Sequence, residues 1–260
     1  SLYEIANSIG CEITKWIPDE KNNWDFDIEF LKKSIKKNTK LIVINFPHNP
    51  TGALISIEKL KQIIKIAAKN NIFIFSDEMY RFLEYNKNDT LPSASDLYPN
   101  AVSLFGMSKT FGLPGLRIGW LTTKNKKVFE SLAAFHDYTT ICSSAPSEIL
   151  ALIALKAKDT IIKRNLEIIS KNLVILDNFF EKNKETFSWN KPKAGSIAYP
   201  RYLKKGTDTT KLCLDLVNKK GVMLLPSHVY GFDNNHVRIG FGRRNMPKSL
   251  NLLEDFLNNK

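Results

Sequence analysis

Short apolar runs, separated by helix-like and turn-rich stretches, constrain the fold of this 260-residue chain most strongly. The runs at residues 40–46, 71–76 and 101–105 are each typical of a buried strand, and a further strand is predicted over residues 116–121. Between the first two runs, residues 57–70 place apolar side chains on one face at helical spacing. Apolar strands with a helix between them predict a mainly parallel sheet covered on both faces.

The later part of the chain is organised differently. A long helical pattern runs from Pro146 to about Lys182, with only a weak interruption near residues 158–159. Beyond it the sequence predicts two strands and a closing helix, over residues 222–225, 236–241 and 249–257. We therefore expect a larger α/β unit over residues 1–170 and a smaller α+β unit over residues 171–260.

The charge and the apolar content narrow the range of partners. The formal net charge is +12, but the excess is mostly lysine spread along the chain, with only seven arginines. This pattern favours diffuse surface basicity over a nucleic-acid groove, and it would modestly attract an acidic or phosphorylated small molecule. No apolar run approaches the roughly 18 residues that span a bilayer. The sequence thus predicts neither a nucleic-acid nor a membrane partner.

The cysteines and histidines show no metal-binding or disulfide pattern. Cys11, Cys142 and Cys213 are far apart and form no Cys-x-x-Cys, which fits a reducing compartment such as the cytoplasm. The four histidines also lack ligand spacing, so no metal site is predicted. The opening Ser-Leu-Tyr-Glu resembles neither a signal peptide nor an initiator context, so we expect the natural N-terminus to lie upstream.

One lysine differs from the other thirty in its surroundings. Lys109 lies in a turn-rich loop between two apolar runs, whereas nearly all the others lie in polar, helix-like stretches. Arg117 follows eight residues later, with Gly112, Pro114 and Gly115 between them. A lysine in such a loop is suited to form a Schiff base with a carbonyl cofactor, and Arg117 can hold the phosphate of that cofactor.

Three further segments lie at predicted strand ends or within a late strand. Residues 45–52 contain Asn49, whose amide can donate, although a plain turn is the favoured interpretation of this segment in isolation. Asp77 is either the N-cap of a following helix or a carboxylate that keeps a heterocyclic nitrogen protonated, with the Tyr80 phenol nearby. Arg238 either faces solvent on an edge strand or is buried to hold a carboxylate bidentately.

Together these segments resemble the class I/II aminotransferases, the fold type I enzymes that use pyridoxal 5′-phosphate. The shared pattern is Asn-Pro-Thr-Gly at 49–52, Asp-x-x-Tyr at 77–80, Ser-Lys at 108–109 with an arginine eight residues on, and a late Arg-Ile-Gly strand. The resemblance extends from Ser1 to the C-terminal helix. It implies a three-layer α/β/α large domain with a mainly parallel sheet, and a smaller α+β C-terminal domain.

The resemblance also implies roles for individual residues. Lys109 would form the Schiff base with the cofactor aldehyde, and its freed amine would then move the proton at the substrate Cα. Asp77 would pair with the pyridinium nitrogen and keep the ring an electron sink. Asn49 and Tyr80 would hydrogen-bond the phenolic oxygen of the ring.

The two arginines complete this implied site, and two features depart from the family pattern. Arg117 would bind the cofactor phosphate, and Arg238 the α-carboxylate of an amino acid or 2-oxo acid. Many relatives carry a serine where this chain has Gly106. They also have an N-terminal portion, with a phosphate-binding loop, before the stretch that resembles residues 1–6. We therefore expect an N-terminally incomplete large domain.

Three functions are compatible with the sequence. The leading hypothesis, implied by the resemblance, is an aminotransferase that moves an amino group between an L-amino acid and a 2-oxo acid, and that forms a homodimer. A lyase of the same fold is the second, because it begins with the same Schiff base to Lys109. A non-catalytic protein unable to hold the cofactor is the third, because no sequence for the phosphate loop is found.

Overall fold

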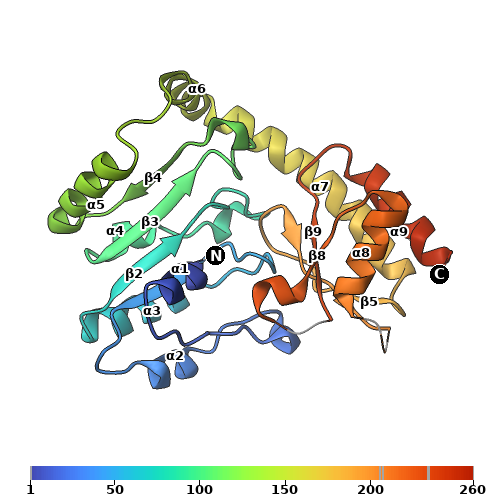
Figure 1. Ribbon diagram of the computed structural model, residues 1–260, viewed down its shortest axis with the longest axis horizontal. Coiled ribbons are helices and arrows are strands. Elements are labelled where there is room, and N and C mark those ends of the chain that lie inside the picture. Colours follow the sequence, from blue (N-terminus) through green and yellow to red (C-terminus); the bar gives the residue numbers. More distant parts are fainter. Residues whose placement is uncertain (1, 205, 207, 233–234, 260) are drawn as a thin grey trace.

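The computed structural model describes residues 2–204, 206, 208–232 and 235–259. In these residues the chain builds a larger part around a four-stranded sheet and a smaller part around short antiparallel strands. The long helix α7 (Lys158–Lys182) runs from the larger part into the smaller one (Figure 1). No described helix combines the length and apolar character needed to cross a bilayer.

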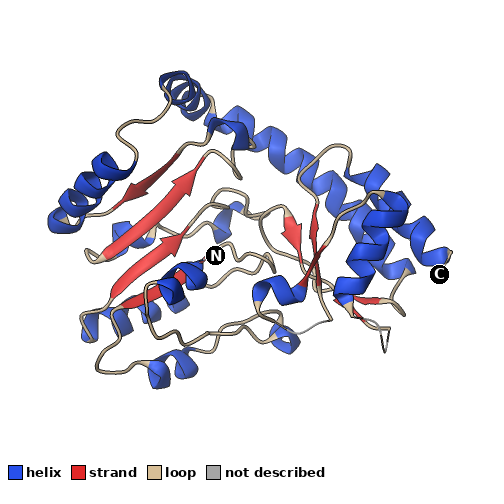
Figure 2. Ribbon diagram, viewed as in Figure 1, coloured by secondary structure: helices blue, strands red, loops and turns tan. Residues whose placement is uncertain are grey.

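The main sheet has the strand order β1-β2-β3-β4. Its strands are β1 (Leu41–Asn45), β2 (Phe73–Asp77), β3 (Ala101–Gly106) and β4 (Gly119–Thr122). β1, β2 and β3 are parallel, and β4 pairs antiparallel with β3 (Figure 2). The prediction of a mainly parallel sheet is therefore confirmed, with one antiparallel edge strand added.

Helix α3 (Ile57–Lys69) covers one face of this sheet. It begins after Ser56, whose hydroxyl accepts a hydrogen bond from Lys59 N and so satisfies a free N–H of the first turn. Its apolar stripe enters a core shared with α2 (Ile28–Ser34), β1 and β2. The buried residues of α3 are Leu60, Ile63 and Ala67. The predicted helix over residues 57–70 is thus confirmed.

The two faces of the sheet differ in cover at β1 and β2. Alternate side chains of β1 point into the core, as the two-residue period of a strand requires. The side chains on the opposite face, those of Leu41, Val43 and Phe73, are exposed. The sequence predicted cover on both faces of the sheet. Among the described residues, only one face is covered at β1 and β2.

The remaining helices of the larger part are α1 (Leu2–Ser8), α4 (Ala94–Leu97), α5 (Lys126–Thr139) and α6 (Ala145–Lys156). α5 and α6 lie on the β4 side of the sheet (Figure 1). Ala157 separates α6 from α7, which confirms the weak interruption predicted inside the long helical pattern. The sequence had suggested no element over the residues of α5.

The smaller part packs two antiparallel sheets against helices. Its elements are β5 (Phe187–Ser188), β6 (Ile197–Ala198), β7 (Arg201–Tyr202), α8 (Thr209–Lys220), β8 (Leu225–Pro226), β9 (Val237–Gly240) and α9 (Met246–Asn258). β5 pairs with β7, and β9 lies between β6 and β8. The core here includes Leu176 of α7, Phe187 and Phe241. This is the α+β unit that the sequence predicted; the division into 1–170 and 171–260 stays a prediction, and its boundary lies within α7.

Two predicted strands differ from the structure. Leu116 ends a 3₁₀ turn and Arg117 caps it with a left-handed backbone, so strand β4 begins only at Gly119 and not at residue 116. Pro114, Gly115 and the αL residue supply the turn, and these break an extended strand. Residues 222–224 likewise lie outside a strand, because β8 covers only Leu225–Pro226.

Candidate active site

The candidate residues gather where the parallel strands of the main sheet end. Asn49 follows β1, Asp77 ends β2 with Tyr80 just beyond it, and Lys109 follows β3. The register aligns the ends of the first two strands, with Asn45 opposite Asp77. In open α/β sheets the ligand crevice lies outside the carboxyl ends of the strands, so this is the expected edge for a site.

The loop after β1 is held by Asn45, a residue that the sequence analysis did not select. Its side-chain Nδ2 donates to the backbone oxygen of Asp77 at 3.0 Å, and its Oδ1 accepts from the backbone N of Asn49 at 2.8 Å. One amide therefore fixes Asn49 to the end of β2. The signal that could have found it is its position as the last residue of a buried strand, directly before the Pro-rich loop.

The same loop touches the smaller part of the molecule at Gly52. Its backbone oxygen accepts from Lys193 N at 3.0 Å and from Ala194 N at 3.2 Å. Gly52 has φ +68°, and an added Cβ would lie 2.8 Å from the backbone oxygen of Ala194. Only glycine combines this backbone with so close an approach. The Asn-Pro-Thr-Gly segment is therefore an inter-unit contact as well as a turn.

Asp77 begins a tight turn and does not cap a helix. Its Oδ1 accepts from the backbone N of Met79 at 3.1 Å, and residues 79–82 form turns. The helix N-cap interpretation of Asp77 is thus wrong. Burial raises the pKa of the Asp77 carboxyl, and the Met79 N–H and the Lys109 cation partly offset this effect. A partly buried carboxylate of this kind is stabilised by a cationic partner.

Tyr80 is buried, with 4% of its surface exposed, and burial raises the pKa of its phenol to about 12. The Lys109 Nζ lies 5.8 Å from the centre of the Tyr80 ring. The pKa of the Lys109 amine is lowered, first by partial burial and then by the Arg238 cation, while Asp77 opposes the shift. The side chain of Lys109 as a whole remains solvent-accessible. Lys109 is therefore an accessible amine with a weakened hold on its proton.

Arg238 projects from the middle of a sheet. β9 pairs with β6 on one side and with β8 on the other, so the interpretation of Arg238 as a residue of an edge strand is wrong. Its Nη1 donates to Asn49 Oδ1 at 3.3 Å, and its Cζ lies 5.7 Å from the centre of the Tyr230 ring. Tyr230 is the last residue of a 3₁₀ helix, Ser227–Tyr230. The structure brings this tyrosine to Arg238.

Arg117 lies on the exposed side of the lysine loop. Its Nη1 donates to the backbone oxygen of Pro114 at 3.0 Å, and its charge contributes to the lowered pKa of Lys109. Gly106, at the end of β3, is closely packed. An added Cβ there would lie 3.1 Å from the Met79 sulfur and 3.2 Å from the backbone oxygen of Ile118. A serine at position 106 would therefore crowd the turn that follows Asp77.

A separate cavity of about 590 Å³ adjoins this edge of the sheet. Asn49 and Tyr230 are among its lining residues, together with aromatic side chains such as Trp24 and Tyr199. Lys109 and Asp77 do not line it. We therefore place the candidate site at the strand ends, and the cavity beside it. Within the described residues, no group of three or more histidine, cysteine or acidic side chains is placed to hold a metal ion.

Comparison with known proteins identifies a family that this sequence matches. The model of the family described as aminotransferase class I and II matches residues 1–254. Capreomycidine synthase of Streptomyces vinaceus is 29% identical over 242 residues, 93% of this chain and 61% of that protein. A probable aspartate aminotransferase of Methanocaldococcus jannaschii is 27% identical over 245 residues, 91% of this chain and 64% of that protein.

A solved structure extends the match to three dimensions. It is a PLP-dependent aminotransferase from Streptococcus suis, 33% identical, with a TM-score of 0.92 over 99% of this chain and 68% of that one. The chain therefore belongs to the class I and II aminotransferase family. It spans 61% and 64% of the length of the two curated relatives named above.

Proposed function

We propose that the protein is a pyridoxal-phosphate-dependent aminotransferase of amino acid metabolism, which moves an amino group between an L-amino acid and a 2-oxo acid. The observation that carries this proposal is the convergence of Lys109, Asp77 and Tyr80 at the ends of parallel strands. The amine lies near the Tyr80 ring and is influenced by the Asp77 charge. Family membership supports the same reaction class.

The residues present fit the cofactor. A Schiff base requires an unprotonated amine, and the lowered pKa of Lys109 favours that form. Burial raises the pKa of Asp77, so a cation beside it would stabilise its ionised form. A protonated ring nitrogen of the cofactor would be such a cation. Tyr80 is a phenol held neutral by its raised pKa of about 12, so it can donate to a ring oxygen.

We assign the proton transfer at the substrate Cα to the Lys109 amine, once exchange with the substrate has freed it. When bound, pyridoxal phosphate supplies an electron sink for the carbon that loses this proton. Asn49 joins Tyr80 at the ring oxygen. Because Asn45 fixes the backbone of Asn49, its amide needs only a side-chain rotation to turn from Arg238 to a ligand.

The two arginines take the anionic groups. Arg238 is proposed to bind the substrate α-carboxylate with its planar guanidinium, which suits bidentate binding. Its contact with Asn49 places it beside the loop after β1. Arg117 is proposed to bind the phosphate. Its left-handed backbone, φ +53°, holds it at the corner where the lysine loop enters β4.

We also propose a homodimer in the cytoplasm. The apolar side chains of Phe129 and Phe135 on α5, and of Ile149 and Leu152 on α6, are exposed. Apolar patches of this kind are characteristic of interaction surfaces, and a second copy is the occupant that the family implies. The exposed cysteines Cys11 and Cys142 are free, which accords with a reducing compartment.

Cofactor uptake tests the proposal. We expect purified protein mixed with pyridoxal phosphate to develop the visible absorbance of a Schiff base, and Lys109→Ala to lack it. Lys126→Ala, at an exposed lysine of α5, is the matched control and should keep it. A wild-type protein that remains colourless, or a Lys109→Ala variant that retains the band, would overturn the proposal. The first outcome would favour a non-catalytic protein.

A lyase of the same fold is the second candidate, because one relative is named a synthase and not an aminotransferase. Both reactions use Lys109 in the same first step. Incubation with an amino acid and a 2-oxo acid separates them. Exchange of the amino group between the two supports transfer, whereas release of ammonia and pyruvate supports elimination at the β-carbon.

A further inference from the structure

Thr110, the residue after Lys109, faces away from solvent and is 3% exposed. Its Oγ1 lies 2.6 Å from the backbone oxygen of Arg81 and 3.1 Å from that of Met79. A hydroxyl has one hydrogen to donate, so the shorter contact to Arg81 is the main bond. The hydroxyl therefore joins the lysine loop to the turn that follows Asp77.

The bonded carbonyl belongs to a peptide under conformational constraint. It precedes Phe82, which has φ +71°. Large aromatic residues rarely adopt this left-handed backbone, and such residues persist only where the surroundings hold them. The Arg81 guanidinium lies 5.0 Å from the centre of the Phe82 ring. The Thr110 hydroxyl thus holds the Arg81–Phe82 peptide, where the turn adopts its left-handed backbone.

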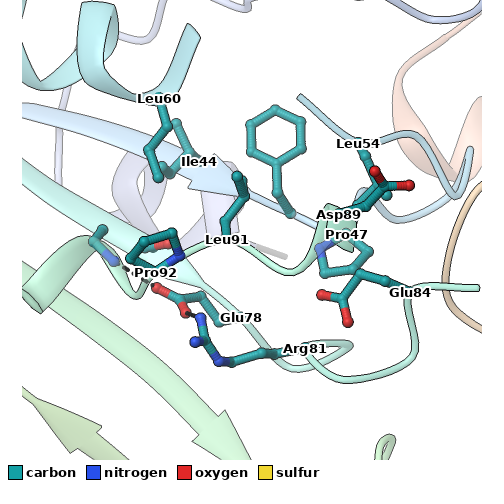
Figure 3. Close-up of a pocket in the computed structure, with 13 residues that line it drawn as sticks. Ile44, Pro47, Leu54, Leu60, Glu78, Arg81, Glu84, Asp89, Leu91 and Pro92 are labelled. Atoms are coloured by element: carbon teal, nitrogen blue, oxygen red, sulfur yellow. Dashed lines mark hydrogen bonds and ion pairs between the residues drawn. The ribbon is translucent and has the colours of Figure 1, made fainter. Parts of the chain in front are cut away.

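The far side of the turn is held by Glu78, which is 6% exposed. Its Oε2 accepts from Arg81 Nη1 at 3.0 Å, and its Oε1 accepts from Ser93 Oγ and from Ala94 N, each at 3.0 Å. Figure 3 shows the Glu78 carboxylate directed at the Arg81 guanidinium beside a small cavity. That cavity measures about 20 Å³, room for about one water molecule, so this side of the turn is closely packed.

The other side of Thr110 is held as well. Its backbone oxygen accepts from Asn165 Nδ2 of α7 at 2.9 Å. The side chain and the backbone of this single residue therefore connect the lysine loop to the Asp77 turn and to the long helix. The amine of Lys109, immediately before it, lies over the Tyr80 ring, with Nζ 5.8 Å from the ring centre.

We propose that Thr110 is a positioning residue whose hydroxyl sets the place of Lys109 relative to Tyr80, through the strained turn at Phe82. The inference rests on the proposed function, because it assigns the hydroxyl to the geometry of the cofactor site. Without the hydroxyl, the Arg81 carbonyl loses its donor and the turn relaxes. Tyr80 directly precedes Arg81, so its phenol would then move away from the cofactor ring oxygen to which it is proposed to donate.

The test compares Thr110→Val, which removes the hydroxyl at nearly constant shape, with Thr110→Ser, which keeps it. Thr139→Val is the matched control, since Thr139 is an exposed residue of α5 whose hydroxyl also bonds a backbone carbonyl. One readout is the pH midpoint of the visible Schiff-base band in protein loaded with pyridoxal phosphate. The other is hydrogen exchange of the backbone amides of residues 79–83 in cofactor-free protein.

We expect Thr110→Val to raise the pH midpoint by roughly half a unit or more, because a ring oxygen that loses a phenol donor holds the Schiff-base proton more tightly. Exchange in residues 79–83 should rise severalfold. Thr110→Ser and Thr139→Val should match wild type in both readouts. Unchanged midpoint and exchange in a folded Thr110→Val protein would overturn the inference. A wild-type protein without the band would overturn the proposed function, while the exchange result still decides the role of Thr110.

Discussion

Glu20 forms a contact that closes the N-terminal segment onto the smaller part of the molecule. Its carboxylate accepts from Arg201 Nε at 2.9 and 3.1 Å, and also from Arg201 Nη2. The ring nitrogen Nε2 of His236, a fully buried residue, lies 3.0 Å from Glu20 Oε1. Because an ionised carboxylate can only accept, this nitrogen is the donor. His236 stands two residues before Arg238, so the contact supports the strand that carries the candidate carboxylate-binding arginine.

The structure sets the expected cost of replacing Glu20 by glutamine. Removing one partner of a fully buried ion pair costs about 3–5 kcal/mol, whereas exposed pairs contribute about 0–1 kcal/mol. The side chains of Glu20 and Arg201 are 17% and 33% exposed, which lies between these limits. We therefore expect Glu20→Gln to lower the free energy of unfolding by about 1–3 kcal/mol at neutral pH.

The pH dependence of this cost follows from the direction in which the pKa of the Glu20 carboxyl is shifted. Burial alone would raise the pKa of the Glu20 carboxyl, but the hydrogen bonds from Arg201 and His236 outweigh it and the pKa is lowered. The folded protein therefore binds this proton more weakly than the unfolded chain. The stabilisation is complete above the unfolded pKa of about 4.5 and is lost as the pH falls through the lower, folded pKa.

Urea denaturation of wild type and Glu20→Gln, from pH 7 down to pH 3, measures both effects. Glu12→Gln is the control, because Glu12 lies on the same segment in an exposed ion pair with Lys36 and should change stability by less than about 1 kcal/mol. The difference between wild type and Glu20→Gln should shrink as the pH falls below 4.5. A difference that stays constant with pH, or equals that of the control, would refute the reasoning.

Two other substitutions test the inter-unit contact and the proposed dimer. Gly52→Ala should destabilise by about 2–4 kcal/mol, because an alanine there is strained at φ +68° and meets the Ala194 oxygen at 2.8 Å; a thermal melt measures this, and an unchanged melt contradicts it. Leu152→Asp on α6 should convert a dimer to a monomer in sedimentation velocity, whereas Leu214→Asp, an equally exposed leucine of α8, should not. Identical sedimentation of both variants would remove α6 from the interface.

Local patterns in the sequence were sufficient to predict the main elements of the fold. The run at 40–46 is apolar, short and ended by prolines, and it forms β1. The spacing in residues 57–70 forms α3. The prediction of a strand over residues 116–121 is wrong at its start, because this apolar stretch begins within a turn. Pro114 starts a 3₁₀ turn and Arg117 adopts a left-handed backbone, so apolar character alone did not mean an extended chain there.

The sequence could predict which residues belong to the candidate site, but it could not predict the contacts that hold them there. Asp77 and Arg238 each had two interpretations in the sequence, and the turn after β2 and the central place of β9 exclude only the N-cap and the edge-strand interpretation. Their roles at a cofactor and a substrate remain proposals. Asn45 and Thr110 each form a hydrogen bond with a residue 29 or more positions away. Tyr230 contacts Arg238 through its ring. Periodicity and capping rules describe near neighbours, so they carry no information on such pairs.

The contacts around the site also explain why its residues belong to two structural units. Asp77 ends β2, Tyr80 lies in the turn just beyond it, and Lys109 follows β3, so all three are positioned by neighbouring strands of the main sheet. Arg238 stands on the other unit, and it reaches this edge through Asn49. The contacts at Gly52 and Glu20 hold the two units together from either side. Loosening either contact should therefore impair the proposed carboxylate binding by Arg238 before it disturbs Lys109, the proposed Schiff-base residue, so that substrate affinity and cofactor attachment would be affected separately.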